Sequence, residues 1–490
     1  MTLQTPETPV RRDPAAPAVS GAERPAPRRA RLLRELNVSG FVRRIAGALD
    51  FWSSAPERRA VPRMGQVRDW CRAAFEERGR IAALMAIAKV ADAYRRMDAA
   101  GKDSFFALLR DEFSVDDAAL QQAIVGYEAT GSDGAGRGEA LVRLSQALES
   151  PRLVLFEQFN TIPSGIKFLV DLRADLVERL ARDPELAPIE YELRRKLSSF
   201  FNLGFLQLQR IGWESPAALL ENLMRYEAVN RITTWDDLKH RLVSDRAAFA
   251  FLHPAMPCEP VIFVEVALVQ GMADNIQRLL DPATPDLRPD QADTAIFYGI
   301  SNAQRGLRGI QFGNLLIKQV VARLHSEVPN LETFATLSPL PRFRGDYLDA
   351  AVADGSIVEH YEKGERERLR QVAQADSPAA AVRELLAEAE WFRNEDAAKA
   401  LRPGLLRAAR HYLFERTHNG HAACPVAHFH GSNGARLERI NWLGDTSEQG
   451  MRQSAGIMAN YLYDLVRFEK HQSDYLRTAH VAVGRAVKAL

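Results

Sequence analysis

A glycine-bearing loop carries the first chemical signal of this sequence. Gly306, Gly309 and Gly313 allow the backbone to come close to a ligand, and Arg308 adds a fixed positive charge among them. Apolar residues then recur at helical spacing over residues 312–324. Because the first amides of a helix lack internal partners and attract anions, the loop is suited to a pyrophosphate. An ordinary strand-to-helix turn is the alternative interpretation.

Two widespread nucleotide-binding motifs are absent from this loop. It contains neither G-x-x-x-x-G-K-[ST] nor G-x-G-x-x-G, which argues against a triphosphate loop and a Rossmann dinucleotide site. The segment RGIQFG at 308–313 resembles instead the coenzyme A pyrophosphate loop of the acetyltransferase (GNAT) fold. Arg308 and Gly313 fit the outer positions of that motif, but Gln311 stands where its middle glycine would be. This departure argues against a routine acetyltransferase.

Two histidines and a serine are the other residues with chemical potential. His428 and His430 lie two positions apart in a run that reads as extended, so they would share a face and could pair as metal ligands. Apart from Cys424, no carboxylate or cysteine stands at ligand spacing, and the sequence therefore predicts no metal site. Ser338 precedes a proline after a short strand, a common turn pattern, and no G-x-S-x-G motif surrounds it. Spacing alone assigns these residues no role.

A mixed sheet must position these residues. Residues 295–300 and 334–337 read as strands on either side of the helix at 312–324, and strand, loop, helix and strand make a parallel crossover unit. Upstream, residues 248–252 and 261–268 read as two more strands, the second apolar enough to be buried on both faces. The loop is therefore expected at the carboxyl end of a strand in the middle of the sheet.

Helical patterns flank this sheet on both sides in the sequence. Residues 31–187 are rich in Ala, Leu, Arg and Glu and poor in strand formers, which predicts a helical domain for association or support. The sheet-containing domain is expected over residues 188–490, with a polar helical insert near 364–400. The fold class predicted from this order is α+β.

The segment after His430 predicts a hairpin followed by a helix. Asn433-Gly434 between two extended runs is a strong hairpin signal. The helix predicted after the hairpin carries Tyr461 and Tyr463, and Tyr463 is assigned to core packing. Asp445 and Tyr461 are the two candidates for a hydrogen-bond partner of the histidine.

Length and composition are those of a globular protein of two or three domains. The chain has 490 residues, 46% hydrophobic and 26% charged, and a formal net charge of +1. A near-zero charge provides no field that would recruit nucleic acid, and no apolar run approaches the length of a membrane span. Neither nucleic acid nor membrane is an expected partner.

Cysteine usage and the first residues indicate the compartment. Cys71, Cys258 and Cys424 are far apart and form no C-x-x-C pair, which favours a reducing environment and the cytoplasm. Residues 1–30 are rich in Pro, Ala and Arg and are expected to be disordered. Acidic residues interrupt this segment, which argues against a transit peptide.

Seven sequence blocks in order resemble the malonyl-CoA decarboxylase family, and together they cover most of residues 191–464. They are FNLGFLQLQRI (201–211), SPAALLENLMRYEAV (215–229), HPAMPCEPVIFVEVAL (253–268), FYGISNAQRGLRGIQFGNLLIKQVV (297–321), TLSPLPRF (336–343), FHGSNGARLERINWLGD (429–445) and MANYLYDL (458–465). Asn230 departs from the family pattern, which has histidine there.

This resemblance implies an enzyme that converts malonyl-CoA to acetyl-CoA and carbon dioxide. It implies a helical oligomerisation domain followed by a GNAT-like catalytic domain, and a homo-oligomer, either a dimer or a tetramer. Ser338 and His430 match the catalytic pair, with His430 as proton donor and Ser338 as the group that orients and polarises the substrate. The expected coenzyme A contacts are Arg308, Gly309, Ile310, Gln311, Phe312, Gly313, Asn314 and Ile317. No cofactor is expected, since the thioester is its own electron sink.

Two other functions are compatible with parts of the sequence. The same fold could transfer an acyl group from coenzyme A to an amine, which would require an acceptor. A coenzyme A-binding regulator without turnover would bind malonyl-CoA and release no carbon dioxide, and the presence of both Ser338 and His430 in their motifs argues against it.

Overall fold

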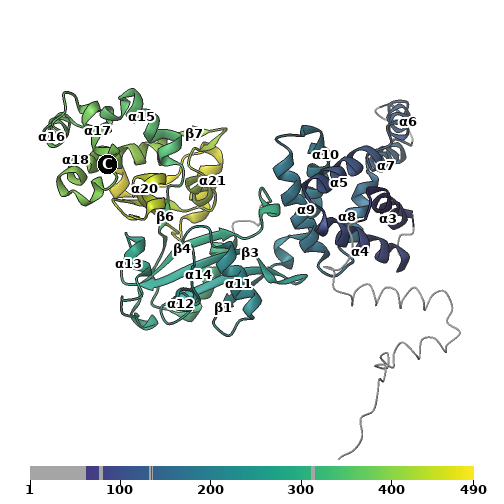
Figure 1. Ribbon diagram of the computed structural model, residues 1–490, viewed down its shortest axis with the longest axis horizontal. Coiled ribbons are helices and arrows are strands. Elements are labelled where there is room, and N and C mark those ends of the chain that lie inside the picture. The colour runs from purple at the N-terminus through teal and green to yellow at the C-terminus, as the bar shows by residue number, and fades with distance from the viewer. Residues whose placement is uncertain (1–61, 77–80, 132–133, 135, 311–314) are drawn as a thin grey trace, which may run out of the picture.

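The computed structural model describes residues 62–76, 81–131, 134, 136–310 and 315–490. In Figure 1 the first helices form one body, and the sheet with its covering helices lies between that body and a C-terminal group of helices. The helices of the first body are α3 (Met64–Glu76), α4 (Ile81–Arg96), α5 (Ala99–Glu112), α6 (Asp117–Glu128), α7 (Arg137–Ala147), α8 (Pro151–Phe159), α9 (Gly165–Arg179) and α10 (Ala187–Phe200). The predicted helical N-terminal region is confirmed. The predicted disordered segment at 1–30 lies outside the described residues.

A mixed sheet follows the helices, as predicted. Its hydrogen-bonded order is β1-β2-β3-β4-β5-β10-β9-β11, and β6 pairs with β10. The strands are β1 (Gln207–Ile211), β2 (Arg246–His253), β3 (Met256–Val269), β4 (Thr294–Asn302), β5 (Thr333–Thr336), β6 (Ser338–Pro339), β9 (Arg436–Asn441), β10 (Met458–Leu462) and β11 (Ala482–Val483). The fold is therefore α+β, with a helical region before a mixed sheet.

Strands β4 and β5 are parallel, and helix α14 (Leu315–Glu327) connects them. Their pairing starts at Thr294 and Thr333 and stops at Phe297 and Thr336, although β4 continues to Asn302. Beyond this point the strand that follows β5 pairs only with β10. The two parallel strands thus separate at their carboxyl ends, where the loop after β4 and Ser338 both emerge.

One apolar core joins the helical region to the sheet. Phe168 of α9, Leu307 of the loop and Phe297 of β4 belong to the same cluster of buried side chains. The contact between α9 and the short 3-10 turn Arg305–Leu307 lies within this core. The helical region therefore packs directly on the segment that follows β4. The division predicted at residues 187/188 coincides with the first residue of α10 and stays a prediction.

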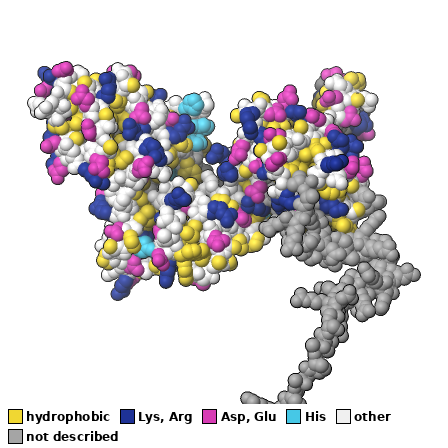
Figure 2. All heavy atoms as spheres, viewed as in Figure 1, with side chains coloured by type: hydrophobic (Ala, Val, Ile, Leu, Met, Phe, Trp, Pro, Cys, Tyr) yellow, Lys and Arg dark blue, Asp and Glu magenta, His cyan; other side chains and the backbone are white. Residues whose placement is uncertain are grey.

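The C-terminal part of the chain adds a group of helices on the side of the sheet that faces away from the first body (Figure 1). Helices α15 (Asp349–Asp354), α16 (Lys363–Ala373), α17 (Pro378–Ala387) and α18 (Glu395–Arg410) lie between β6 and β9 in the chain. They cover the region for which a polar helical insert near 364–400 is predicted. Figure 2 shows Lys and Arg interspersed with Asp and Glu over the visible face, in keeping with the net charge of +1. Within the described residues no helix is long and apolar enough to cross a membrane.

Two predictions about the last third of the chain are wrong. The run around His430 is helix α19 (Pro425–Ser432), with proline in its first turn, and not an extended strand. Asn433 and Gly434 do not form a hairpin: Asn433 ends the helix, and Gly434 turns the chain with a φ of 77°. An Asn-Gly pair can end a helix as well as form a hairpin turn. The neighbouring residues in the sequence do not distinguish between these two roles.

The single helix predicted after this turn is also divided. Helix α20 (Glu448–Ser454) ends where Ala455 and Gly456 both adopt a positive φ, of 51° and 78°. Two left-handed residues in succession cannot continue a right-handed helix, so the chain enters strand β10. Tyr461 therefore lies on a strand, and Tyr463 directly after it.

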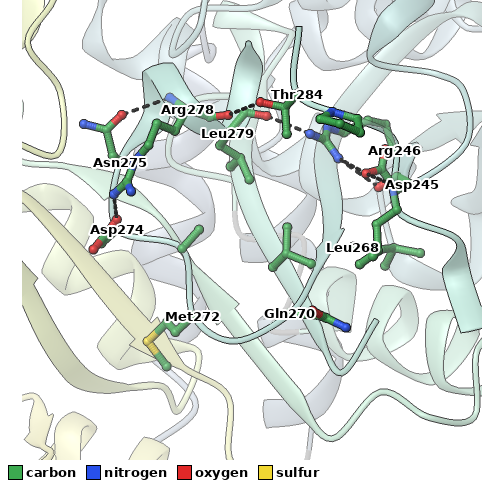
Figure 3. Close-up of a pocket in the computed structure, with 14 residues that line it drawn as sticks. Asp245, Arg246, Leu268, Gln270, Met272, Asp274, Asn275, Arg278, Leu279 and Thr284 are labelled. Atoms are coloured by element: carbon green, nitrogen blue, oxygen red, sulfur yellow. Dashed lines mark hydrogen bonds and ion pairs between the residues drawn. The ribbon is translucent and has the colours of Figure 1, made fainter. Parts of the chain in front are cut away.

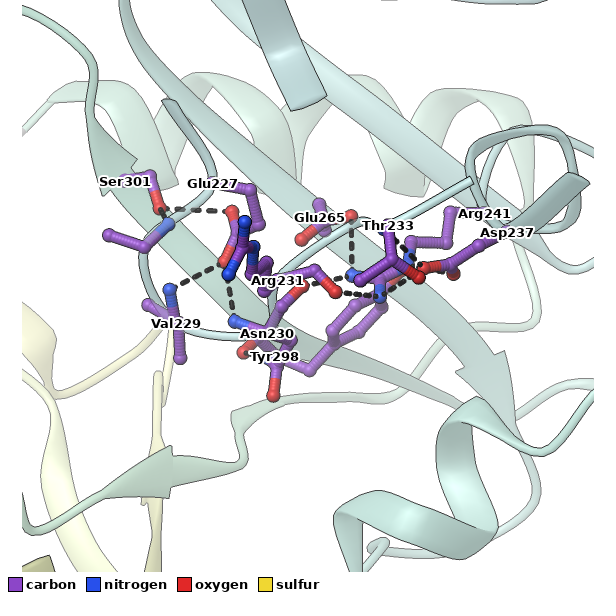
Figure 4. A network of polar contacts seen from close by, with 11 residues as sticks. Glu227, Val229, Asn230, Arg231, Thr233, Asp237, Arg241, Glu265, Tyr298 and Ser301 are labelled. Carbon is purple, nitrogen blue, oxygen red and sulfur yellow. Dashed lines mark hydrogen bonds and ion pairs between the residues drawn. The ribbon is translucent and has the colours of Figure 1, made fainter. Parts of the chain in front are cut away.

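A buried polar network fixes β4 where its pairing with β5 has ended (Figure 4). Glu265 of β3 is 1% exposed and faces Arg241, with 3.4 Å between Oε1 and Nη1. Asn230, which departs from the family pattern, donates its side-chain N–H to the Tyr298 carbonyl at 2.9 Å. Ser301 of β4 donates to Glu227 at 3.0 Å. These contacts tie the segment after α11 (Ala217–Tyr226) to two strands at once.

The contacts of Glu265 in this network do not fully compensate for burying a charged carboxylate. Burial raises its pKa well above the ordinary value of 4.5, the charge of Glu227 raises it further, and Arg241 opposes the rise. Its Oε2 atom has no hydrogen-bond partner among the described residues. A protonated Glu265 therefore fits this site better than a carboxylate.

We predict that Glu265→Gln makes thermal stability less dependent on pH. The folded-state pKa lies above the unfolded value of 4.5, so the stability linked to this proton is full below that value and falls as pH rises through the folded pKa. Glutamine mimics the protonated acid, and the Tm of the variant relative to wild type should therefore increase from about pH 5 to about pH 8. Differential scanning fluorimetry measures it.

The exposed Glu448→Gln is the matched control, because its side chain is 93% exposed. A Tm difference for Glu265→Gln that is the same at every pH would contradict a protonated Glu265.

Candidate active site

Ser338 and His430 meet at the carboxyl end of β5. Their Oγ and Nε2 atoms are 3.0 Å apart, although the residues are 92 positions apart in sequence. The two residues are 6% and 2% exposed. Ser338 opens β6, where the chain leaves β5, and His430 stands in the last turn of α19. The structure thus brings together the two residues that the resemblance implies as a pair, in a site shielded from water.

Two tyrosines hold the His430 ring. Its Nδ1 atom lies 2.8 Å from the Tyr463 hydroxyl, and the Tyr461 ring stacks on it with centroids 4.4 Å apart. Asp445, one of the two candidate partners from the sequence, instead accepts hydrogen bonds from Gln277 and the Ser447 amide. The other candidate, Tyr461, contacts the ring by its face, and its hydroxyl has no partner among the described residues.

Core packing, the role predicted for Tyr463 from the sequence, leaves out its contact with His430. On the helix predicted for this segment, positions i and i+2 would diverge. On an extended segment these positions share a face. The Tyr-x-Tyr spacing was therefore the available signal, and it required recognising the strand β10.

Thr336 completes the chain of hydroxyl groups. Ser338 Oγ donates to Thr336 Oγ1 at 2.8 Å, and the Tyr461 amide donates to the same oxygen at 3.1 Å. Thr336 is fully buried, and like Ser338 it faces the His430 side because alternate residues of an extended chain share a face. The Thr-x-Ser spacing was the signal for this residue in the sequence.

Burial sets the protonation of the pair. It lowers the pKa of His430 from 6.5 to about 3 and raises the pKa of Tyr463 well above its ordinary value. Both groups are therefore neutral near pH 7. Because Ser338 Oγ donates to Thr336, it is available to accept from Nε2–H, and in that tautomer the Tyr463 hydroxyl donates to Nδ1.

The loop after β4 presents an exposed arginine beside a left-handed glycine. Arg308 and Gly309 are exposed, and Gly309 has a φ of 78°, which favours glycine. Ile310 and Ile317 are buried at 7% and 2% exposure, so their side chains belong to the core. The other four predicted contacts lie outside the described residues: Gln311, Phe312, Gly313 and Asn314.

The two histidines that could have paired as metal ligands point apart. On α19 they are two positions apart and diverge around the helix. His428 Nδ1 contacts the Tyr475 hydroxyl at 2.7 Å, whereas His430 contacts Ser338 and Tyr463. In the described ranges no group of three or more His, Cys, Asp or Glu side chains could hold a metal ion.

A cavity of about 360 Å³ lies at another part of the sheet (Figure 3). Its charged lining groups bond to one another: Arg246 pairs with Asp245 at 2.8 Å and donates to the Leu279 carbonyl. Arg278 is paired with Asp274 across the opening. Neither Ser338 nor His430 lines this cavity, and it offers no nucleophile beside a base. The pair at β5 is therefore the candidate active site.

A buried serine–histidine pair at the end of one of two separating parallel strands, with an arginine–glycine loop after the other, is the arrangement of an enzyme. Comparison with known proteins identifies its family. The malonyl-CoA decarboxylase C-terminal domain model matches residues 204–490, and the N-terminal domain model matches residues 113–201. The chain belongs to the malonyl-CoA decarboxylase family.

Individual relatives agree with this family. Mitochondrial malonyl-CoA decarboxylase of Anser anser anser is 38% identical over 343 residues, 68% of each chain. That of Rattus norvegicus is 34% identical over 356 residues, 71% of this chain and 72% of the relative. The crystal structure of malonyl-CoA decarboxylase from Rhodopseudomonas palustris, at 37% identity, covers 87% of this chain and 99% of its own with a TM-score of 0.77. The one from Agrobacterium vitis has the same identity and TM-score and covers 86% and 98%.

We predict that the His430 imidazole stays neutral and keeps its proton on Nε2 at about pH 5, since its pKa is lowered to about 3. Long-range ¹H–¹⁵N NMR of the histidine rings, with His430→Gln for assignment, measures both protonation and tautomer. Tyr463→Phe removes the donor to Nδ1 and should shift signal toward the other tautomer. A His430 signal that titrates near the ordinary 6.5 would contradict the buried neutral state.

Proposed function

We propose that this protein decarboxylates malonyl-CoA to acetyl-CoA and carbon dioxide at the Ser338–His430 pair. The observation that carries the proposal is the 3.0 Å contact between Oγ and Nε2, buried at the carboxyl end of β5 in a chain of this family. The site supplies an imidazole that can carry a proton on Nε2 and a hydroxyl group beside it, both buried. These are the two groups that the loss of carbon dioxide from a thioester requires.

The substrate supplies the rest of the chemistry. Breaking the bond between the carboxylate carbon and the α-carbon releases carbon dioxide and leaves an electron pair that spreads onto the thioester oxygen as an enolate. Forming a C–H bond at the α-carbon then gives acetyl-CoA, and the reaction consumes one proton overall. Because the thioester accepts the electron pair, we propose that no cofactor or metal takes part.

His430 is the proposed proton donor and Ser338 the group that orients the substrate. The anionic malonyl group and the enolate place negative charge beside the ring, which raises the pKa of His430 in the complex. The ring thereby takes up one proton, and the resulting imidazolium transfers Nε2–H to the α-carbon and returns to its neutral form, while the Tyr463 hydroxyl at Nδ1 holds the ring in place. Ser338 donates its hydroxyl to the carboxylate or to the thioester oxygen and forms no acyl-enzyme. Excluded water keeps these hydrogen bonds strong.

We propose that the loop after β4 binds the coenzyme A part. Arg308 is exposed and can reach a phosphate, and Gly309 permits close approach of the backbone. The other proposed contacts are Ile310, Gln311, Phe312, Gly313, Asn314 and Ile317. A GNAT-type fold is supported by the parallel β4–β5 crossover in an otherwise mostly antiparallel sheet and by the early end of its pairing.

We further propose that the protein is a homo-oligomer, held together by its helical region, in a reducing compartment such as the cytoplasm. Helix α6 buries no residue, and α7 buries only Ala140. Four large apolar side chains on and beside this helix pair are at least half exposed: Val125, Leu141, Val142 and Leu148. The three cysteines are free thiols.

The runner-up function is acyl transfer from coenzyme A to an amine acceptor. It would use the same proposed fold and loop, and it differs in requiring a second substrate. Malonyl-CoA incubated alone distinguishes the two, because decarboxylation needs no acceptor. A regulator that binds malonyl-CoA without turnover would release no carbon dioxide.

We predict that purified protein releases acetyl-CoA and carbon dioxide from malonyl-CoA alone. His430→Ala and Ser338→Ala should each lower kcat/KM at least about 100-fold, the scale for a lost acid or oxyanion donor. His428→Ala is the matched control, since its ring faces Tyr475 and not the pair. Absence of release by wild type, or a trapped acyl-serine, would contradict the mechanism.

We predict a solution mass that is a multiple of 54.7 kDa by light scattering. Changing Val125, Leu141 and Val142 together to glutamate should produce monomers, because charges would replace an apolar contact surface. Leu476→Glu, at a site 68% exposed on α21 (Phe468–Thr478), is the control and should leave the mass unchanged. A wild-type mass of one chain would refute the homo-oligomer.

A further inference from the structure

One arginine of the helical region reaches the proposed coenzyme A loop. Arg173 of α9 donates both hydrogens of Nη1 to loop carbonyls, to Gly306 at 2.6 Å and to Arg308 at 2.9 Å. Its Nε and Nη2 atoms donate to Glu190 of α10, at 3.1 and 2.6 Å. The Arg173 side chain is 4% exposed. Four of the five guanidinium N–H groups thus donate, two to Glu190 within the helical region and two to the loop.

The loop lies directly on α9. A Cβ atom at Gly306 would stand 1.8 Å from the Val170 carbonyl oxygen, so only glycine allows this approach. Leu307 is 2% exposed and shares the core cluster of Phe168 and Val170. The backbone at Gly306 is therefore held by contact with α9, and Arg173 sets the direction of its carbonyl groups.

The direction of a carbonyl fixes that of the next amide. The described chain contains no cis peptide bond, and in a trans peptide the C=O and the following N–H point in opposite directions. Since the Arg308 carbonyl points inward at Arg173, the Gly309 N–H points outward. That amide donates to no other described residue, and Gly309 is exposed. The Gly309 amide and the exposed Arg308 guanidinium are thus two donors on neighbouring residues of the loop.

We infer that Arg173 is a positioning residue for the coenzyme A site: it orients the Arg308–Gly309 peptide so that its N–H meets the pyrophosphate. This rests on the coenzyme A loop of the proposed function. Arg173 contributes orientation rather than charge, because Glu190 neutralises it 2.6 Å away. The helical region is thereby a part of the substrate site as well as a proposed oligomerisation domain.

The chain contains a matched control for this contact. Arg152 is also buried in the helical region, where it pairs with Glu192 at 2.6 Å and donates to the Leu109 carbonyl. It makes no contact with the loop. Lysine at either position keeps the charge beside the glutamate and loses the fork of donors. The two substitutions therefore disturb similar ion pairs, and only one of them touches the loop.

The test compares Arg173→Lys with Arg152→Lys and wild type in two measurements. Isothermal titration with coenzyme A and with pantetheine measures binding without turnover. Decarboxylation of malonyl-CoA and of malonyl-pantetheine, which lacks the pyrophosphate and the nucleotide, gives kcat and KM for each. Thermal unfolding identifies any variant that is not folded at the assay temperature. Gly306→Ala disturbs the same loop independently, and its Tm is recorded alongside.

The expected result is an effect limited to the pyrophosphate-bearing ligands. Arg173→Lys should weaken coenzyme A binding and raise the KM for malonyl-CoA about tenfold, with kcat within about twofold and the pantetheine ligands unchanged. Arg152→Lys should match wild type with every ligand. This pattern in folded protein supports positioning, since a general loss of structure would affect both ligand classes.

Three results would overturn the inference. They are unchanged coenzyme A binding by folded Arg173→Lys, an equal loss with the pantetheine ligands, and an equal effect of Arg152→Lys. Failure of the proposed function looks different: wild type would release no carbon dioxide. The titration with coenzyme A would then still decide whether Arg173 positions the loop.

Discussion

The position of the candidate site depends on where the backbone pairing between strands β4 and β5 ends. Strands β4 and β5 pair in parallel only up to Phe297 and Thr336, and β4 continues without this partner. Parallel strands present their carboxyl ends at one edge of a sheet, so the Arg308 loop and Ser338 lie at the same edge although α14 separates them in sequence. The register shift between Glu265 and Val266 and the polar network around Glu265 hold β4 in this path.

Burial gives the pair of residues its chemical state. The described residues that contact the His430 ring supply aromatic rings and hydroxyl groups and no carboxylate, and burial makes the neutral imidazole the stable form. A carboxylate partner would hold the proton on the ring in the empty site and would repel an anionic substrate. A tyrosine hydroxyl fixes the tautomer without adding charge. In the proposed mechanism, the negative charge that favours protonation of His430 arrives with the substrate, which links proton uptake to binding.

Local pattern was sufficient for most of the fold and for part of the site. The strand predicted at 261–268 and the strand–helix–strand crossover predicted over 295–337 are confirmed, because strand and helix periodicities are local properties of the sequence. The predictions of an extended run at His430 and of a helix at Tyr463 are wrong, since an Asn-Gly pair ends helices as well as forming hairpin turns. Tyr463 and Thr336 become neighbours of the site only through pairing between distant strands. Sequence spacing contains no information on such contacts.

No sequence pattern predicts the contact between Arg173 and the loop after β4. This contact makes the helical region part of the proposed substrate site. The two carbonyl groups that Arg173 contacts, those of Gly306 and Arg308, lie 133 and 135 positions away in the sequence, beyond the predicted domain boundary. Without α9 and α10, the Gly306 and Arg308 carbonyls would lose their buried donor and Leu307 its apolar cover. An unpaired carbonyl would turn toward water, and the Gly309 amide would turn with it. The sheet therefore does not by itself determine the shape of the loop after β4.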